Sequence, residues 1–396
     1  MKIGIDGRVL MDKNYSGVSS YTANLLNALL ASKKNNSFHL FCNSFDKKNN
    51  LSIWQKHDCQ VLKTSFPNKV FNYLLQNLFS WPKLDKVLGG VDIFFAPHFN
   101  FLKLSKNVKL VLTVHDLSFL RYPEFFSFRK NFWHQALRVK RLLKRADKIV
   151  AVSENTKHDL QELFKIDSQK IEVIYSGNNY QSEALTRLKS EERALFNSQK
   201  ESDNIFLQTK KIKKDFILFL GNIEPRKNIS GLIEAYNILR TNNEKFQEVQ
   251  LVLAGGKGWK TKNILKTWKK SPFKNDIKFL GYVNDVEKEA LYRQAKLFIY
   301  PSFYEGFGFP PLEAASFGVP VISSHVSSLP EILENSSLLV NPFIVDELAE
   351  AMSIFLNDDN LRSKFIKAGL EKASQFSWEK TANLYLKLFE ELHENK

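Results

Sequence analysis

Residues 300–318 read YPSFYEGFGFPPLEAASFG, and this stretch decides how the rest of the chain is interpreted. The apolar run Leu297–Tyr300 at its start is typical of a buried strand, and Gly318 has the residue type that favours the C′ position of a helix. Between strand and helix, a glycine-bearing turn leaves backbone N–H groups unpaired beside the positive end of the helix dipole. The stretch therefore predicts a strand, a phosphate-binding turn and a helix.

Two carboxylates flank this turn. Glu305 precedes it, and Glu313 is expected in the first helical turn, with seven residues between the two. An anion held by backbone amides would bring the groups on its two sides close to different carboxylates, and sugar hydroxyls donate charge-assisted hydrogen bonds to such oxygens. Gly306 and Gly308 let the backbone approach a ligand closely. The alternative is that Glu313 only stabilises the helix dipole and that Glu305 is a surface loop residue.

Short apolar runs alternate with helical patterns along the whole chain. In the first half these runs are 2–6, 38–42, 92–96, 108–114, 148–152 and 171–174. In the second half they are 216–220, 250–254, 277–280, 297–300, 319–323 and 338–340. This alternation predicts an α/β protein with two successive doubly wound, mostly parallel sheets, which bind ligands beyond the carboxyl ends of their strands.

Length and polar sequence place the domain boundaries. A chain of 396 residues exceeds the usual size of one core, and 43% hydrophobic with 25% charged residues is typical of a globular protein. The pattern becomes polar over 181–214, so we expect one domain in 1–200 and a second in 201–377. An amphipathic helix in 378–396 is long enough to cross back to the first domain.

Composition also limits the compartment and the partners. Cys42 and Cys59 provide neither a disulfide framework nor a zinc cluster, and no Asp-x-Asp pair offers a metal site, so we expect a reducing compartment and no metal. We find no secretory signal and no uncharged stretch of membrane-spanning length. Residues 1–200 carry 31 Lys and Arg against 17 Asp and Glu, whereas the remainder carries 26 against 25. Such asymmetry suggests a polyanionic partner for the first half, either a membrane surface or nucleic acid.

Several strand ends carry residues suited to a nucleotide sugar. In 221-GNIEPRKN-228, Arg226 and Lys227 oppose the helix dipole, so an anion is a natural reason for them. Glycines in 253-LAGGKG-258 and 280-LGYV-283 could free the backbone around Gly255, Tyr282 and Val283 to read a flat base edge. Hydroxyls in 323-SSHVSSLPE-331 follow another strand. No Gly-x-Gly-x-x-Gly or Walker motif supports a classical dinucleotide or ATP site.

His115 and Asp116 follow the strand that ends at Val114 in the first half. An imidazole at a strand end can hydrogen-bond a sugar or an attacking hydroxyl, although a lone histidine is more often a packing residue. Asp116 could orient the ring or cap the next turn.

The series EPRKN, LAGGKG, FLGYV, YPSFYEGFGFPPLEAASFGVPVI and SSLPE resembles the retaining glycosyltransferases of the GT-B fold, in the "glycosyl transferases group 1" family. IGIDGR, TVHDLSFLRYPEFF and FSWEKTANLYLKL extend the resemblance to nearly the whole chain. It implies two Rossmann-like domains that face each other across a cleft: an N-terminal acceptor domain and a C-terminal nucleotide-sugar donor domain. A final helix returns to the first domain, and no metal or other cofactor is required.

The resemblance also implies residue roles. Glu305 would hold the hydroxyls of the donor sugar, and Glu313 would hold the ribose. Arg226 and Lys227 would neutralise the diphosphate together with the amides around Phe307 and Gly308, and the loop at Gly17 would close over the phosphates. The family often has a basic or small residue where this chain has Asn222, so Asn222 is left out of the site.

Within the family that the chain resembles, the members with an HDLSFLRYPE-like sequence are similar to bacterial mannosyltransferases of surface polysaccharide and lipopolysaccharide synthesis. We therefore expect transfer of a hexosyl unit, mannose from GDP-mannose foremost, to a saccharide or polyprenyl-linked glycan. Alternatives are a UDP-sugar donor (glucose, galactose or N-acetylhexosamine) and a nucleotide-sugar epimerase on a related scaffold. A nucleic-acid-binding protein is disfavoured, because no recognition helix or stacking motif appears.

Two aromatic and basic stretches suggest that the protein reaches its acceptor at a membrane surface. Residues 125–145 carry eight Lys, Arg or His without an acid, interleaved with aromatic and leucine residues, and 69–84 is apolar with basic ends. Helices of this kind lie in membrane interfaces. We expect a cytoplasmic protein that associates peripherally with the anionic inner face of the cell membrane.

Overall fold

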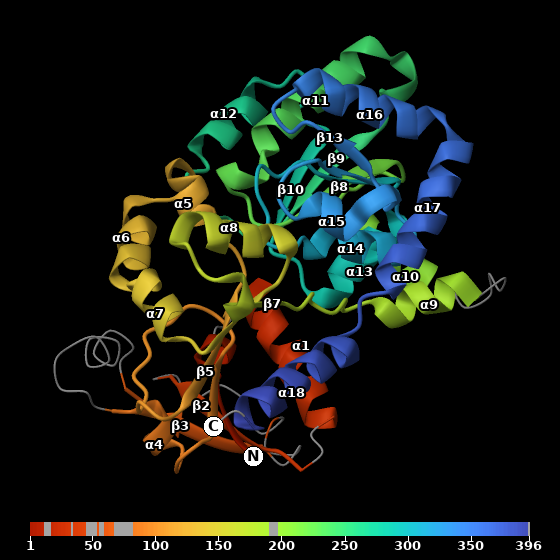
Figure 1. Ribbon diagram of the computed structural model, residues 1–396. Helices are drawn as coiled ribbons and strands as arrows, with labels where there is room; N and C mark the ends of the chain where they lie inside the picture. The colour runs from red at the N-terminus through yellow and green to blue at the C-terminus, as the bar shows by residue number, and fades with distance from the viewer. Residues whose placement is uncertain are drawn as a thin grey trace. The chain divides into compact units, whose positions relative to one another are not determined.

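The computed structural model describes residues 1–11, 17–32, 35–44, 54, 59–66, 82–189 and 197–394. The chain forms two compact units (Figure 1). The first contains Met1–Leu117, Arg129–Gly177 and Ser377–Lys396, and the second contains Ser118–Phe128 and Asn178–Phe376. The longer segment of the second unit begins at Asn178, whereas the sequence placed the boundary after residue 200.

In the described residues, the sheet of the first unit has seven parallel strands in the order β3-β2-β1-β4-β5-β6-β7. They are β1 (Lys2–Asp6), β2 (Ser37–Asn43), β3 (Gln60–Thr64), β4 (Ile93–Ala96), β5 (Lys109–Val114), β6 (Lys148–Ala151) and β7 (Ile171–Val173). The strand order reverses between β1 and β4, which is the switch point where such sheets bind ligands. Six strands match the predicted runs, and the edge strand β3 was missed because its sequence QVLKT is only half buried.

Helices of the first unit are η1 (Arg8–Met11), α1 (Gly17–Ala31), α4 (Leu84–Val87), α7 (Val139–Arg145), α8 (Glu154–Phe164), η3 (Ser168–Lys170) and α18 (Trp378–Glu394). Helix α6 (Phe128–Ala136) begins where the two units meet in the sequence. The basic stretch 125–145 is not one helix, because Arg138 has a left-handed backbone (φ 49°) that separates α6 from α7. Among the described residues, no helix is both long and apolar enough to span a membrane.

The sheet of the second unit has six parallel strands in the order β10-β9-β8-β11-β12-β13. They are β8 (Phe216–Leu220), β9 (Gln250–Ala254), β10 (Ile277–Gly281), β11 (Leu297–Tyr300), β12 (Val321–Ser324) and β13 (Leu338–Val340). All six were predicted. Their order reverses between β8 and β11, so the carboxyl ends of these two strands are the second place where the fold favours a ligand.

The longer helices of this unit are α9 (Gln181–Lys189), α10 (Asn197–Thr209), α11 (Ile229–Asn242), α12 (Lys262–Lys270), α13 (Asp285–Gln294), α14 (Phe309–Ser316), α16 (Val345–Asn357) and α17 (Asp359–Ser374). The short ones are α5 (Ser118–Arg121), η2 (Pro123–Phe125), η5 (Pro225–Lys227), η6 (Glu244–Phe246), α15 (Leu329–Leu333) and η7 (Glu334–Ser336). Helix α9 packs against α17, so the polar stretch that suggested a domain junction belongs to the second unit.

The C-terminal helix α18 packs against α1 within the first unit (Figure 1). Three buried hydroxyls connect this pair to the sheet. The hydroxyl of Tyr385 on α18 lies 2.7 Å from the hydroxyl of Tyr21 on α1 and 2.7 Å from Oγ1 of Thr113 on β5. A buried hydroxyl is stable only when it is hydrogen-bonded, so this network fixes how α18 lies on the unit.

We predict that Tyr385→Phe lowers the free energy of unfolding by about 1–3 kcal/mol, because it leaves the hydroxyls of Tyr21 and Thr113 without their shared partner. Urea denaturation followed by circular dichroism measures this change. Leu384→Ala on the same helix is the control, since Leu384 is 42% exposed and its loss should change stability by less than about 0.5 kcal/mol. Equal stability of the two variants would contradict the role of the hydroxyl network.

Candidate functional site

The turn between β11 and α14 has the conformation that its sequence predicts. Gly308 has φ 103° and precedes α14, and Gly318 follows the helix with φ 69°. A Cβ atom on Gly308 would lie 2.7 Å from Cδ2 of Leu329, so both the backbone conformation and the space require glycine. Because α14 begins at Phe309, Glu313 lies beyond the first helical turn, one position deeper than expected.

Two serines from the next strand-helix connection hold this turn. The Glu305 N–H donates to Oγ of Ser327 at 2.9 Å. The Ser328 hydroxyl donates to the carbonyl oxygens of Glu305 and Phe307 at 3.0 and 3.1 Å. These serines belong to the SSLPE motif, and the sequence alone does not connect their hydroxyls with this turn.

Glu305 is buried and pairs with both predicted cations. Its Oε2 lies 3.1 Å from Nη1 of Arg226, and its Oε1 lies 2.5 Å from Nζ of Lys227. Lys227 also donates to the Tyr300 hydroxyl at 2.5 Å, and Arg226 donates to the Tyr304 carbonyl at 2.5 Å. The adjacency of β8 and β11 brings these residues together, so the alternative of Glu305 as a surface residue is excluded.

The electrostatics of this group keep the carboxylate charged. Burial alone would raise the pKa of Glu305, but Arg226 and Lys227 outweigh it and lower that pKa to about 2. Burial and the neighbouring Arg226 lower the pKa of Lys227, and Glu305 acts in the opposite direction. The two cations therefore have fixed positions before any ligand arrives.

Glu224 is a member of the group that sequence reasoning missed. It is 1% exposed, and its Oε1 lies 3.0 Å from Nη2 of Arg226. Its Oε2 has no hydrogen-bond partner among the described residues. Glu224 and Glu305 thus hold the guanidinium of Arg226 from two sides. An acid two residues before the Arg-Lys pair was the available signal.

Glycines join the carboxyl ends of β8, β9 and β10. Gly221 N–H donates to the Ala254 carbonyl at 2.9 Å, and Gly255 N–H donates to the Gly281 carbonyl at 2.8 Å. A Cβ atom on Gly255 would lie 2.0 Å from the Gly221 carbonyl oxygen. The Gly255 N–H is therefore engaged by the backbone. Beyond β10, Tyr282 is 59% exposed and Val283 is half-buried.

Glu313 lies in a separate set of contacts. Its Oε1 accepts from Nδ2 of Asn179 at 3.1 Å, and its Oε2 accepts from the Tyr292 hydroxyl at 3.1 Å. Lys288 Nζ lies 3.7 Å from the same Oε2. Glu313 is 5% exposed, so its environment is a polar cluster rather than the helix terminus of the alternative interpretation.

In the first unit, His115 lies at the carboxyl end of β5. Its Nε2 lies 2.8 Å from the Pro97 carbonyl oxygen, so Nε2 carries the proton and Nδ1 is left as an acceptor. The Tyr21 ring packs edge-on against the imidazole at 4.6 Å between centroids. Burial lowers the pKa of His115, so the ring is neutral near pH 7. Gly17 begins α1, and 12–16 of the predicted phosphate loop lie outside the described residues.

A second polar group at the switch point of the first sheet was not predicted. Asp6, at the end of β1, is fully buried and pairs with Arg8 at 2.6 Å. Nδ2 of Asn100, which follows β4, donates to the same carboxylate at 3.2 Å. His98 lies beside Asn100, and burial lowers the pKa of His98 to about 4. Only the pairing of β1 with β4 brings these residues together, so the sequence alone did not connect them.

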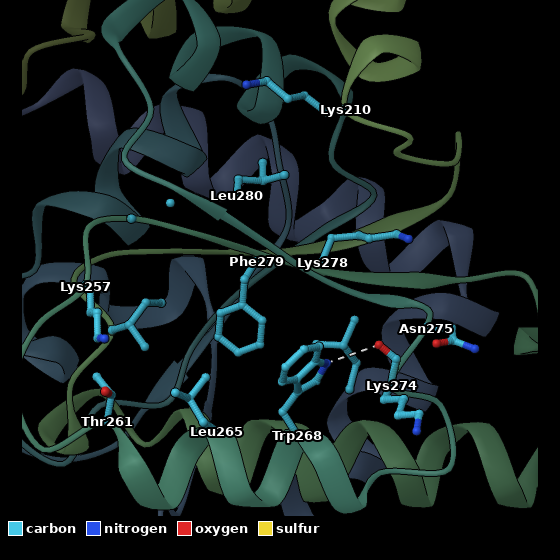
Figure 2. Close-up of a pocket in the computed structure, with 14 residues that line it drawn as sticks. Lys210, Lys257, Thr261, Leu265, Trp268, Lys274, Asn275, Lys278, Phe279 and Leu280 are labelled. Carbon is cyan, nitrogen blue, oxygen red and sulfur yellow. Dashed lines mark hydrogen bonds between the residues drawn. The ribbon is translucent and has the colours of Figure 1, made fainter.

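A cavity of about 770 Å³ lies beside β10 and α12 (Figure 2). Of the residues predicted to bind the donor, Gly255 lines it. The cavity thus begins at the strand ends of the second sheet.

Comparison with known proteins identifies the family. The model for "Glycosyl transferases group 1" matches residues 199–372, and the model for "Glycosyltransferase Family 4" matches residues 15–181. O-antigen chain mannosyltransferase B of Escherichia coli is 32% identical over 297 residues, which cover 74% of this chain and 72% of that protein. The chain belongs to the glycosyl transferases group 1 family.

Solved structures show the fold. Sucrose-phosphate synthase from Thermosynechococcus elongatus has a TM-score of 0.74 at 20% identity, with 100% of both chains covered. Anabaena Alr3699/HepE, in complex with UDP and glucose, has a TM-score of 0.72 at 18% identity and covers 99% of this chain and 100% of its own. The GT-B fold expected from the sequence is confirmed. The family assignment shows that the protein is a glycosyltransferase.

We predict that Glu305→Gln lowers the free energy of unfolding by about 3 kcal/mol, because it leaves two buried cations without their counter-charge. The pKa of Glu305 is depressed in the folded state, so the unfolded chain binds more protons between pH 4.5 and about 2. The stability that this carboxylate contributes is therefore lost as pH falls through that range.

Urea denaturation at a series of pH values from 7 to 3 checks both points. The loss of stability on acidification should be shallower in Glu305→Gln than in the wild type. Glu379→Gln, which changes an exposed carboxylate on α18, should retain the wild-type profile. A wild-type profile in Glu305→Gln would show that the charge group does not contribute as its contacts suggest.

Proposed function

We propose that the protein is a retaining hexosyltransferase that moves mannose from GDP-mannose to a saccharide or lipid-linked glycan during synthesis of a cell-surface polysaccharide. The observation that carries this proposal is the buried group of Glu305, Arg226 and Lys227 at the switch point of the second sheet. Mannose is favoured because O-antigen chain mannosyltransferase B is similar over most of both chains. The proposal includes no metal and no separate cofactor.

Arg226 and Lys227 would stabilise the leaving nucleoside diphosphate. Cleavage of the sugar–phosphate bond places growing negative charge on the phosphate, and preorganised donors at such a position are commonly the largest catalytic contribution. Because Glu224 and Glu305 already fix the guanidinium of Arg226, little reorganisation is needed when charge develops. The amides of Gly306, Phe307 and Gly308 before α14 would complete the phosphate site.

The two carboxylates would recognise the two ends of the donor. Each oxygen of Glu305 has lone pairs beyond those engaged by Arg226 and Lys227, so it can still accept from a sugar hydroxyl. Glu313 would accept from the ribose, with Tyr292 and Asn179 orienting its oxygens. Tyr282 and Val283 after β10 would contact the base.

The neutral imidazole of His115 would form a hydrogen bond with the donor sugar or with the attacking hydroxyl. With its Nε2 proton donated to Pro97, Nδ1 remains an acceptor for a hydroxyl hydrogen. Retention would follow from attack on the same face that the diphosphate leaves, and the departing phosphate would receive the proton of the acceptor hydroxyl. The Gly17 loop would cover the phosphates.

A UDP-sugar is the second candidate donor. The HepE structure, which has the same fold, contains UDP and glucose. Both candidates use the same phosphate and sugar contacts and differ at the base and at the sugar.

A thermal-shift panel and a transfer assay test the donor. We expect GDP-mannose to raise the melting temperature more than UDP-glucose, and Lys227→Ala to lower turnover by about a hundredfold or more, because a preorganised donor is lost. Lys266→Ala, on the exposed side of α12, is the matched control and should retain activity. Protection by UDP-glucose alone would transfer the proposal to that donor, and protection by neither would reject it.

Helix α6 is the proposed membrane contact. Phe128 is 85% exposed and Phe132 is 63% exposed, and both lie on one face of the helix at a spacing of four residues. Trp133 is 42% exposed. Exposed basic residues lie on α6 and in the segment with α7 that follows it: Arg129, Lys130, Arg138, Lys140, Arg141 and Lys144. Exposed aromatic side chains among cations suit the headgroup region of an anionic bilayer, and we place the enzyme at the inner face of the cell membrane. The other basic stretch, 69–84, lies mostly outside the described residues.

Flotation with vesicles of phosphatidylglycerol and phosphatidylcholine tests this contact. The double substitution Phe128→Ser and Phe132→Ser should weaken binding by roughly tenfold or more, because burying one such ring contributes about 1.5–3 kcal/mol. Leu163→Ser is the control, since it removes an exposed apolar residue from α8. Unchanged flotation of the double variant would exclude α6 as the docking surface.

A further inference from the structure

The second unit contains a short segment from the first half of the sequence. Ser118–Phe128 belongs to this unit, although the residues on both sides of it, Met1–Leu117 and Arg129–Gly177, belong to the first. The segment forms α5 and η2 and includes the aromatic sequence FLRYPEFF at 119–126. The donor contacts proposed above do not use it, so the reason for its place in the donor unit lies in what its side chains touch.

Two rings of the segment pack against the loop that carries Glu305. The Tyr122 and Phe125 rings stack on each other, with 5.4 Å between centroids and an interplanar angle of 13°. Phe125 stacks on Phe303 at 5.5 Å, and the Tyr122 ring lies 5.9 Å from the Tyr304 ring. Such ring pairs stabilise a packed arrangement beyond the area that they bury. Because Phe303 and Tyr304 directly precede Glu305, the rings hold the chain next to this carboxylate.

The same loop is bonded to Arg226. The Phe303 N–H donates to the Arg226 carbonyl at 2.9 Å, and the Arg226 guanidinium donates to the Tyr304 carbonyl at 2.5 Å. Together with the ion pair to Glu305, three consecutive residues of the loop therefore contact Arg226. A displacement of this loop would move the guanidinium with it.

The segment also contacts a second loop, which follows β9. The Phe126 ring stacks on the Trp259 ring at 5.6 Å between centroids. The Trp259 Nε1–H donates to the Phe125 carbonyl at 2.5 Å, and Nζ of Lys260 donates to the Glu124 carbonyl at 2.6 Å. Ring packing and hydrogen bonds thus join the second loop to the segment.

This second loop is bonded to the chain that carries Glu224. The Ile223 N–H donates to the Gly256 carbonyl at 2.9 Å, and the Gly258 N–H donates to the Ile223 carbonyl at 3.0 Å. A Cβ atom on Gly258 would lie 2.7 Å from the Ile223 carbonyl oxygen, so the two backbones are in close contact. Ile223 directly precedes Glu224, whose Oε1 lies 3.0 Å from Nη2 of Arg226.

We propose that Tyr122 and Phe125 are positioning residues for Arg226. The inference rests on the proposed function, in which Arg226 binds the diphosphate of the donor. The aromatic segment bridges the two loops that hold the guanidinium, one through Glu305 and the other through Glu224, and so keeps both carboxylates in place around it. A cation held in this way stabilises the diphosphate without first being reorganised.

Isothermal titration calorimetry with GDP and with UDP tests this role. The double substitution Tyr122→Ala and Phe125→Ala should weaken binding of the nucleotide that the wild type binds by about tenfold or more, because the guanidinium is no longer held in position. The variant Tyr122→Phe with Phe125→Tyr retains both rings and should bind within about twofold of the wild type. Phe365→Ala is the matched control and should leave binding unchanged, since it removes a half-buried ring from a different ring pair of the second unit.

A double-mutant cycle separates this positioning role from a general structural one. In an Arg226→Ala background, the two alanine substitutions should cause no further loss of affinity, because the rings act through the guanidinium. Trp259→Phe is a second variant, used if circular dichroism shows that the alanine pair does not fold. It removes the hydrogen bond from Nε1 to the Phe125 carbonyl, keeps an aromatic ring, and should weaken binding by about threefold or more.

Three outcomes would overturn the proposal. These are unchanged affinity in the folded alanine pair, or in Trp259→Phe where the pair does not fold; an equal loss in Phe365→Ala; and a loss that adds fully to that of Arg226→Ala. Failure of the proposed function is distinct, because the wild type would then bind neither GDP nor UDP, and the positioning role would be rejected with it.

Discussion

The pairing of Glu305 with Arg226 and Lys227 is the interaction on which the donor side of this protein depends. A buried carboxylate without counter-charges would be neutralised by protonation. Without the carboxylate, the two buried cations would raise the free energy of the folded state. Each member therefore requires the others. The requirement also fixes the fold locally, because η5 and the turn before α14 can meet only where β8 and β11 lie side by side.

This arrangement preorganises the charged side chains, but it also makes the site intolerant of substitutions. The turn that carries Glu305 is held by Ser327 and Ser328, and its passage into α14 requires a glycine at position 308. Side chains that are held in place by packing and by hydrogen bonds to neighbouring residues can stabilise the charge of a transition state without moving. The same tight contacts make a stable fold and an active site hard to separate by mutation. Loss of activity at Glu305 is informative only when stability is measured beside it.

The sequence predicted the sheets well because parallel strands buried on both faces appear as continuous apolar runs. Of the thirteen strands in the described residues, twelve were recognisable in this way, and the exception, Gln60–Thr64, is half-buried at an edge. Breaks between helices were harder to predict from the sequence. No residue type around Arg138 indicates its left-handed conformation. Within the site, Arg226, Lys227 and Glu305 were found because they stand in ordered motifs. Asp6, Arg8 and Asn100 were missed because their proximity follows from strand order and not from spacing.

The net charge of a segment likewise does not show where its charged residues gather. Summed over its second half the chain is nearly neutral, yet eight lysines lie between 257 and 278. In the donor site each cation has an acidic partner, which fixes its position. Around the cavity beside β10, Lys257, Lys274 and Lys278 have no such partner in the described residues, so their ammonium groups can adjust to an anion of variable geometry. A nucleotide diphosphate reacts at one atom and needs the first arrangement.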